Sequence, residues 1–274
     1  MIILKKIIRK LKYLYALNIE RLPYVHWFNP VQTFYVNLKC LPLRQALKFP
    51  VFMYGWSKLY SLYGSMECVG KCRIGMVKFN KSEVDAPCYS SGNAELNLWG
   101  KIVFRGNVEV CSGTKIMVRE RGLLDIGDGA RIMHQCNIAS FKSVKIGSNS
   151  WISHRSQIFD SNFHYVADSL KKSVSPMSKE ISIGDDCWIC NSVTISFGSV
   201  LPNRSIVASH SLVNKDFGSE CGGTVFGGIP AKIVSRNRYR VLNSSFERQL
   251  VLYFSADLNN QDFQIPDHFL EEDF

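Results

Sequence analysis

The sequence predicts an all-β solenoid of the parallel β-helix type, and three observations support this fold class. The first is a run of apolar residues spaced by six, namely Ile183, Ile189, Ile195, Leu201, Val207 and Val213. A helix repeats about every 3.6 residues and a strand about every two, so this spacing fits three short strands per coil, each with one inward apolar residue.

The second observation is that the same spacing appears in two earlier sets, Ile126, Ile132, Ile138 and Ile146, Ile152, Ile158. The third is that two of the three sets open alike, with Ile126-Gly127-Asp128 and Ile183-Gly184-Asp185, while the remaining set opens with Ile146-Gly147-Ser148. Glycine followed by a short polar residue suits a tight corner between two strands. A less regular stretch from Ile102 through Val108 to Thr114 predicts one earlier coil.

The repeat is interrupted once. Ile183 follows Ile158 by 25 positions, where a single step of six is due, so a loop over residues 159–182 leaves the solenoid. It begins with Asp160-Ser161-Asn162-Phe163-His164. Long loops on a rigid repeat scaffold are usually either functional or disordered.

The repeat divides the chain into three regions. Residues 1–94 hold a basic amphipathic start and an aromatic, irregular segment that we expect to cap the first coil, because an uncapped solenoid exposes unpaired strand edges. Residues 95–236 form the predicted β-helix. Residues 237–274 hold a predicted helix near 238–253 and an acidic tail.

Charge is concentrated ahead of the solenoid. The net charge is +10, and residues 1–60 hold ten Lys or Arg against one acid, Glu20. Residues 1–22 form a basic amphipathic pattern, which fits either an anionic membrane surface or packing on the solenoid or a neighbouring subunit. Neither an apolar run of about 18 residues nor a clean signal-peptide core is present, which predicts a cytoplasmic protein, at the inner face of the membrane if residues 1–22 bind lipid. No nucleic-acid-binding motif accompanies the charge, so we expect no nucleic-acid partner.

The cysteine pattern predicts neither a disulfide framework nor a metal site. The nine cysteines are an odd number without a secretory signal. Cys187 and Cys190 fall within the six-residue register, which favours strand packing over redox chemistry. Cys68 and Cys72 lack a second ligand pair, so no metal is expected.

Several motifs, in order, resemble those of one enzyme family. They are the segment from Asp160 to His164, then Trp188-Ile189, then Ser211 to Phe217, then Gly228-Ile229-Pro230-Ala231-Lys232. Over about residues 95 to 240 the chain resembles the hexapeptide-repeat acyltransferases, which are left-handed parallel β-helices, and most of all their O-acetyltransferases of capsule, O-antigen and other surface polysaccharides. The chain departs from that pattern at Asn162, where relatives have a second acid, and at Ala208-Ser209-His210, where many have a glycine-rich corner.

The resemblance implies direct transfer of an acetyl group from acetyl-CoA in a ternary complex. It makes His164 the general base that accepts the proton of an acceptor hydroxyl. Asp160 either orients that imidazole or caps the loop.

The resemblance also implies a site for the CoA moiety. The carried-over positions are Asn191, Ser209, Asn214, Lys215 and Lys232, with Arg236 nearby. Amides and small polar side chains suit pantetheine, and cations offset the nucleotide phosphates. For each of them the alternative is a solvated basic end of the solenoid. Trp151 and Trp188 either line the substrate site or cover a coil edge.

Relatives place this pocket between subunits of a homotrimer, and we expect the same here, because a single coil surface is too flat to bury such a ligand. The expected acceptor is a carbohydrate, a sugar hydroxyl of a surface polysaccharide or its precursor. The alternatives are N-acetylation of an amino sugar, transfer to a small acceptor, or a non-catalytic solenoid scaffold.

Overall fold

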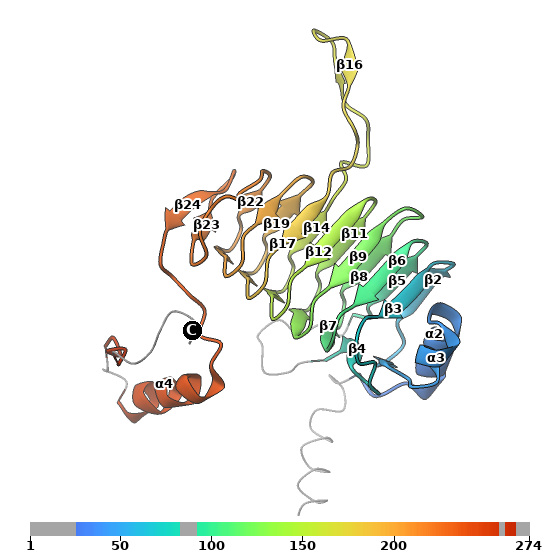
Figure 1. Ribbon diagram of the computed structural model, residues 1–274, viewed down its shortest axis with the longest axis horizontal. Coiled ribbons are helices and arrows are strands. Elements are labelled where there is room, and N and C mark those ends of the chain that lie inside the picture. Colours follow the sequence, from blue (N-terminus) through green and yellow to red (C-terminus); the bar gives the residue numbers. More distant parts are fainter. Residues whose placement is uncertain (1–25, 83–91, 258–260, 267–274) are drawn as a thin grey trace, which may run out of the picture.

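The computed structural model describes residues 26–82, 92–257 and 261–266 of the chain. Its dominant feature is a stack of coils, each of which contributes one strand in turn to three long sheets (Figure 1). Within each sheet the neighbouring strands lie three apart in the sequence through most of the stack, and they pair in parallel. This topology is that of the predicted parallel β-helix.

The strands have the following bounds. The first sheet contains β1 (Val51–Met53), β4 (Val77–Lys81), β7 (Val108–Cys111), β10 (Ala130–Ile132), β13 (Trp151–Ile152), β18 (Trp188–Ile189), β21 (Ile206–Val207), β23 (Val225–Gly227) and β24 (Lys232–Ser235). The second sheet contains β2 (Lys58–Leu62), β5 (Glu95–Leu98), β8 (Lys115–Val118), β11 (Asn137–Ser140), β14 (Gln157–Phe159), β19 (Thr194–Ser196) and β22 (Leu212–Val213). The third sheet contains β3 (Ser65–Cys68), β6 (Lys101–Phe104), β9 (Leu123–Ile126), β12 (Ser143–Ile146), β17 (Ile181–Ile183) and β20 (Val200–Leu201).

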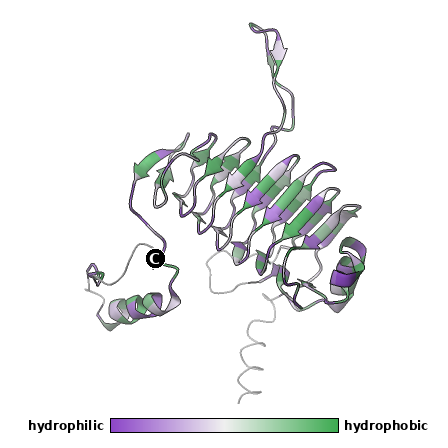
Figure 2. Cartoon of the chain, viewed as in Figure 1, coloured by the Kyte–Doolittle hydropathy of each residue, from purple (hydrophilic) through white to green (hydrophobic). Residues whose placement is uncertain are grey.

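The residues spaced by six form three buried columns, one per sheet. In the first sheet Ile132 is paired with Ile152, which is paired with Ile189 and then Val207. The corresponding columns are Ile138, Ile158, Ile195, Val213 and Ile126, Ile146, Ile183, Leu201. Every member is at most 2% exposed. The prediction from the six-residue spacing is therefore confirmed, and apolar residues recur from strand to strand along the stack (Figure 2).

The corner glycines are explained by contact between coils. A side chain at Gly127 would collide with the backbone of Ser148, and one at Gly147 with the backbone of Gly184. Gly184 lies equally close to the backbone of Asn203. These glycines are needed because successive corners stack backbone against backbone, which leaves no room for a Cβ.

The coils begin earlier than the predicted boundary at residue 95. Strands β1 to β4 belong to the same three sheets as the later strands. These early strands do not show a strict six-residue repeat in the sequence. The reason is two register shifts in their pairing, between Leu59 and Ser61 and between Phe79 and Lys81. A bulge adds a residue to one strand and so breaks a strict repeat.

Helices flank both ends of the stack. Helix α2 (Pro30–Cys40) begins at Asn29, whose side chain accepts a hydrogen bond from the backbone N–H of Gln32, and the short α3 (Leu43–Ala46) follows. At the other end, α4 (Ser244–Ala256) begins several residues after the predicted start at 238, where the Asn243 side chain caps it.

The amphipathic segment of residues 1–22 and the end of the acidic tail lie outside the described residues. Among the helices that the structure does describe, none has the length and apolar character needed to cross a membrane.

An ion-pair cluster on the first sheet predicts a pH-dependent stability. The Glu109 carboxylate accepts hydrogen bonds from Lys78 at 2.7 Å, Lys81 at 3.0 Å and Arg131 at 2.8 Å. Burial alone would raise the pKa of Glu109, but these three cations lower it from 4.5 to about 2. Because the folded-state pKa is depressed, the stabilisation is present above the unfolded value and is lost as the pH falls from about 4.5 to about 2.

We expect Glu109→Gln to lower the free energy of unfolding by about 1–2 kcal/mol at neutral pH, after allowance for solvent screening. The difference from the wild type should shrink as the pH approaches 2, which denaturant titrations at several pH values measure. Glu120→Gln is the matched control, because that side chain is 66% exposed and its ion pair with the neighbouring Arg119 is long, at 4.0 Å. A difference that stays constant across the acid range would contradict the assignment.

Candidate functional site

The predicted interruption of the repeat is a loop that projects from the solenoid between β14 and β17 (Figure 1). Within it β15 (Ala167–Asp168) pairs antiparallel with β16 (Ser173–Val174), and Ser161 bridges to Ser178 nearer the root. The loop is thus a hairpin-like arm. It leaves at the corner where the second sheet turns into the third.

Asp160 anchors the root of this arm. Its side chain is fully buried and accepts hydrogen bonds from three successive backbone N–H groups of the preceding coil, those of Phe141 at 2.7 Å, Lys142 at 2.8 Å and Ser143 at 2.8 Å. Burial raises the pKa of Asp160, and the three amides oppose that rise. Its backbone C=O also accepts from the N–H of Lys179 at 3.0 Å, which closes the arm. This geometry matches the capping alternative, since both carboxylate oxygens are occupied by backbone amides.

His164 is exposed at the root of the arm, directly after Phe163. Phe163 has a positive φ of 61°, and its ring meets Phe141 edge-on at 5.3 Å and Phe159 at 5.5 Å between ring centroids. These contacts fix the backbone from which the imidazole extends. The imidazole is exposed, and no hydrogen bond of the His164 side chain is found within the described part of the chain.

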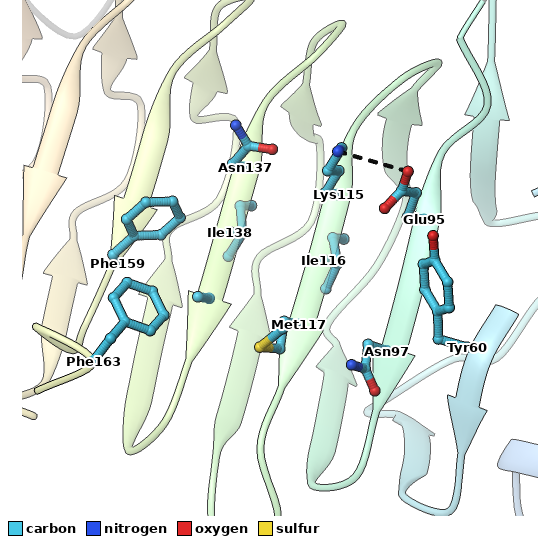
Figure 3. A pocket seen from close by; sticks show the side chains of 11 residues that line it. Tyr60, Glu95, Asn97, Lys115, Ile116, Met117, Asn137, Ile138, Phe159 and Phe163 are labelled. Atoms are coloured by element: carbon cyan, nitrogen blue, oxygen red, sulfur yellow. Dashed lines mark ion pairs between the residues drawn. The ribbon is translucent and has the colours of Figure 1, made fainter. Parts of the chain in front are cut away.

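A groove of about 430 Å³ lies on the outer face of the second sheet and ends at this aromatic cluster (Figure 3). Its lining combines apolar surface with polar side chains from successive strands: Tyr60, Glu95, Asn97, Lys115, Ile116, Met117, Asn137, Ile138, Ala139, Phe159 and Phe163. Lys115 and Glu95 face each other at 3.6 Å. The six-residue repeat and the motifs do not predict this groove. The sequence signal for it is the set of outward positions on β2, β5, β8, β11 and β14, where aromatic and apolar residues such as Tyr60, Met117 and Phe159 accompany the polar ones.

Trp151 and Trp188 lie on the first sheet, away from the groove. They are paired in register on β13 and β18, and each is 38% exposed. The guanidinium groups of Arg131 and Arg240 lie over the Trp151 ring, 5.0 Å and 4.6 Å from its centroid. The Trp188 Nε1–H donates to the Ser153 hydroxyl at 3.3 Å.

Three of the six predicted CoA-binding residues lie at or beside one corner of the solenoid. Asn191 and Ser209 lie on adjacent coils between the first and second sheets, where the Ser209 hydroxyl donates to Asn191 Oδ1 at 2.6 Å. Lys232 opens β24 and is paired with Gly227, which ends β23 at that same corner.

The other three lie elsewhere. Asn214 and Lys215 follow β22, at the corner between the second and third sheets from which the arm leaves two coils earlier. Arg236 forms an ion pair with Glu220 at 2.8 Å. A single subunit therefore brings together Asn191 and Ser209, with Lys232 beside their corner, and does not gather all candidate residues around His164.

Within the described residues, no three or more His, Cys, Asp or Glu side chains are grouped so that they could hold a metal ion. Cys187 is buried within the coil register, and burial raises the pKa of its thiol to about 11. That thiol packs in the core, as the sequence analysis predicted.

No protein-family model matches the chain. It is similar to an uncharacterized 24.8 kDa protein in the cps region of Klebsiella pneumoniae, with 28% identity over 164 residues, 60% of this chain and 68% of that protein. It is also 26% identical over 189 residues to WbbJ of Escherichia coli K12, a candidate lipopolysaccharide biosynthesis O-acetyl transferase, covering 66% of this chain and 92% of that protein.

Among solved structures, the polySia-specific acetyltransferase NeuO is 21% identical, covers 73% of this chain and 91% of its own, and has a TM-score of 0.44. The chain thus combines a parallel β-helix fold with sequence similarity to a protein named for O-acetyl transfer in lipopolysaccharide biosynthesis.

Proposed function

We propose that this protein is an O-acetyltransferase that moves an acetyl group from acetyl-CoA to a sugar hydroxyl of a surface polysaccharide or its precursor. One observation carries the proposal: His164 is exposed at the root of the arm, beside the aromatic end of the groove. The names of the relatives, a lipopolysaccharide O-acetyl transferase and a protein of a cps region, support the acceptor class.

The proposed chemistry needs one proton-transfer group. An imidazole nitrogen of His164 accepts the proton of the acceptor hydroxyl while the hydroxyl oxygen bonds to the thioester carbonyl carbon. The tetrahedral intermediate then breaks its C–S bond, and the departing thiolate takes the proton back from the imidazolium. Both substrates are bound together, so no acetyl group is held by the protein. General-base assistance of this kind contributes about 10²- to 10⁴-fold in rate.

The groove supplies the proposed acceptor site. Sugar rings present apolar faces and a rim of hydroxyls, and the groove is lined by the Phe159 and Phe163 rings at one end and by the amides of Asn97 and Asn137 along its length. Aromatic surface with a few placed polar groups is the usual composition of a ligand site. Because the groove crosses several strands, it suits an elongated acceptor better than a single small one (Figure 3).

The CoA moiety is proposed to lie along the coil corners. Asn191 and Ser209 provide amide and hydroxyl partners for pantetheine, and Lys215, Lys232 and Arg236 provide cations for the phosphates. These residues occupy different corners of one solenoid, so a second solenoid alongside is needed to bring corners and arm together. We therefore propose a homotrimer of side-by-side solenoids with three shared sites, left-handed like the family it resembles.

The proposal is tested by incubating the purified protein with acetyl-CoA and de-O-acetylated surface polysaccharide from its source strain, and by following release of free thiol. The double variant Lys215→Ala, Lys232→Ala should raise the KM for acetyl-CoA about tenfold with little change in kcat, because these cations contact a part of CoA that does not react. Lys145→Ala, an exposed lysine on the third sheet, is the matched control. If the protein neither binds acetyl-CoA nor releases thiol with any acceptor, the proposed acetyltransferase activity is wrong, and the non-catalytic scaffold is the remaining alternative.

A further inference from the structure

Helix α2 has an unusual inward face, which is polar. Its buried residues are Gln32, Thr33, Val36, Asn37 and Cys40. Three of these side chains hydrogen-bond to the backbone of β1 and the turn after it. Gln32 exchanges two bonds with Ser57, at 2.8 and 3.0 Å, and the Thr33 hydroxyl accepts from the N–H of Met53 at 2.9 Å. Asn37 exchanges two with Val51, at 2.7 and 3.2 Å.

The physical reason for this polar face is the end of the stack. β1 is the terminal strand of the first sheet, so no further strand pairs with the N–H and C=O groups of its outer edge. Side-chain amides and a hydroxyl of α2 satisfy those groups in place of a further strand. The helix therefore caps the solenoid through hydrogen bonds.

Four apolar residues of α2 point away from the solenoid, whereas Val36 and Cys40 are buried on its inward face. Val31, Phe34, Tyr35 and Leu38 follow the i, i+3, i+4, i+7 spacing of one helical face, and they are 64%, 56%, 52% and 42% exposed. Trp27 and Trp56, 49% and 63% exposed, border a hollow that Val31 also lines. We name these six residues the cap face.

The charged residues of the segment that forms the cap face have one sign, although one of them, Lys58, pairs with Glu95 of β5 at 3.4 Å. Residues 26–66 contain four cations, Lys39, Arg44, Lys48 and Lys58, and no Asp or Glu. The first three are exposed on α2, α3 and the turn after it. Exposed tryptophan, tyrosine and aliphatic side chains with surrounding Lys and Arg form the composition that suits an anionic membrane interface. Self-association through this face would set cations against cations, which disfavours a second copy as the occupant.

We propose that the cap face docks this protein end-on onto a lipid bilayer with anionic headgroups. Trp27, Trp56 and the outer face of α2 enter the interfacial layer, while Lys39, Arg44 and Lys48 lie over the headgroup phosphates. The contact is separate from any made by residues 1–22, and it does not depend on acetyl transfer. In a trimer of side-by-side solenoids three cap faces point the same way, which multiplies the binding strength.

The test is co-sedimentation of the full-length protein with vesicles of phosphatidylcholine alone or mixed with phosphatidylglycerol, at low and high salt. The triple variant Val31→Gln, Leu38→Gln, Trp56→Gln should partition about 30-fold more weakly onto the anionic vesicles. Because these side chains are exposed, the thermal unfolding midpoint should be unchanged. Wild-type binding should weaken on phosphatidylcholine alone and at high salt.

The control is Val251→Gln, Leu252→Gln, which removes two apolar side chains of similar exposure, 59% and 66%, from α4. It should bind vesicles like the wild type. Equal binding by the triple variant and the wild type would overturn the proposal and leave residues 1–22 as the only membrane contact. A change in sedimentation coefficient without vesicles in the triple variant would also overturn it, because the cap face would then belong to a subunit interface.

Discussion

His164→Ala is expected to reduce kcat for acetyl transfer by about 10²- to 10⁴-fold, because it removes the proposed general base. The side chain is exposed and makes no hydrogen bond within the described residues, so the unfolding midpoint should not move. The KM for acetyl-CoA should also be unchanged, since the proposed contacts with CoA lie elsewhere. Thiol release under saturating acceptor measures kcat and the KM for acetyl-CoA. Calorimetric titration with acetyl-CoA measures its binding affinity independently.

The matched control is Leu170→Ala, a change at a 93% exposed position of the same arm. It should retain wild-type turnover, which would separate loss of the imidazole from a general disturbance of the arm. Wild-type kcat in His164→Ala would exclude His164 as the base, even if the protein proves to be an acetyltransferase.

Asp160→Ala is expected to lower the free energy of unfolding by about 2–4 kcal/mol. It leaves three amide N–H groups at a closely packed corner without their charged acceptor. Asp160→Asn should cost nearly as much, because its amide nitrogen faces donors. Chemical denaturation of each variant measures the loss. Asp168→Asn, on the arm itself, is the control and should cost well under 1 kcal/mol, since that side chain is 41% exposed.

A double-mutant cycle separates the two roles considered for Asp160. If Asp160 only caps the corner, Asp160→Asn should have the same stability cost with His164 present or replaced by Ala. Its effect on kcat should also stay well below that of His164→Ala. Coupling of the two substitutions in kcat would instead assign Asp160 to the orientation of the imidazole.

The repeat and its interruption were predictable because they depend on local periodicity. Each coil places one apolar residue at each inward position, so Ile132, Ile152, Ile189 and Val207 align as soon as the coils stack. The arm was predictable for the same reason, since 25 positions cannot fit one step of six. The motifs at both ends of that gap then pointed to His164.

The first coils and the cap were hidden because their pattern is irregular. Bulges shift the register at β2 and β4, so the strands before residue 95 do not repeat every six positions. The usual interpretation of an amphipathic helix, in which the apolar face packs inward, is wrong for α2. Its partner is the edge of a strand, whose backbone groups need hydrogen bonds. Polar residues such as Asn37 therefore face inward and apolar residues such as Phe34 face outward.

The sequence by itself determined the coil period, the buried columns and the position of the arm with His164, because these follow from the spacing of residues along one chain. Only the tertiary structure decided that Asp160 holds the backbone of the preceding coil, that the outward residues of five strands form a groove, and that α2 turns its apolar face outward. Each of these depends on which residues of different coils become neighbours. Strand pairing between segments about 20 or more positions apart decides which residues become neighbours, and a pattern within one segment does not contain that information.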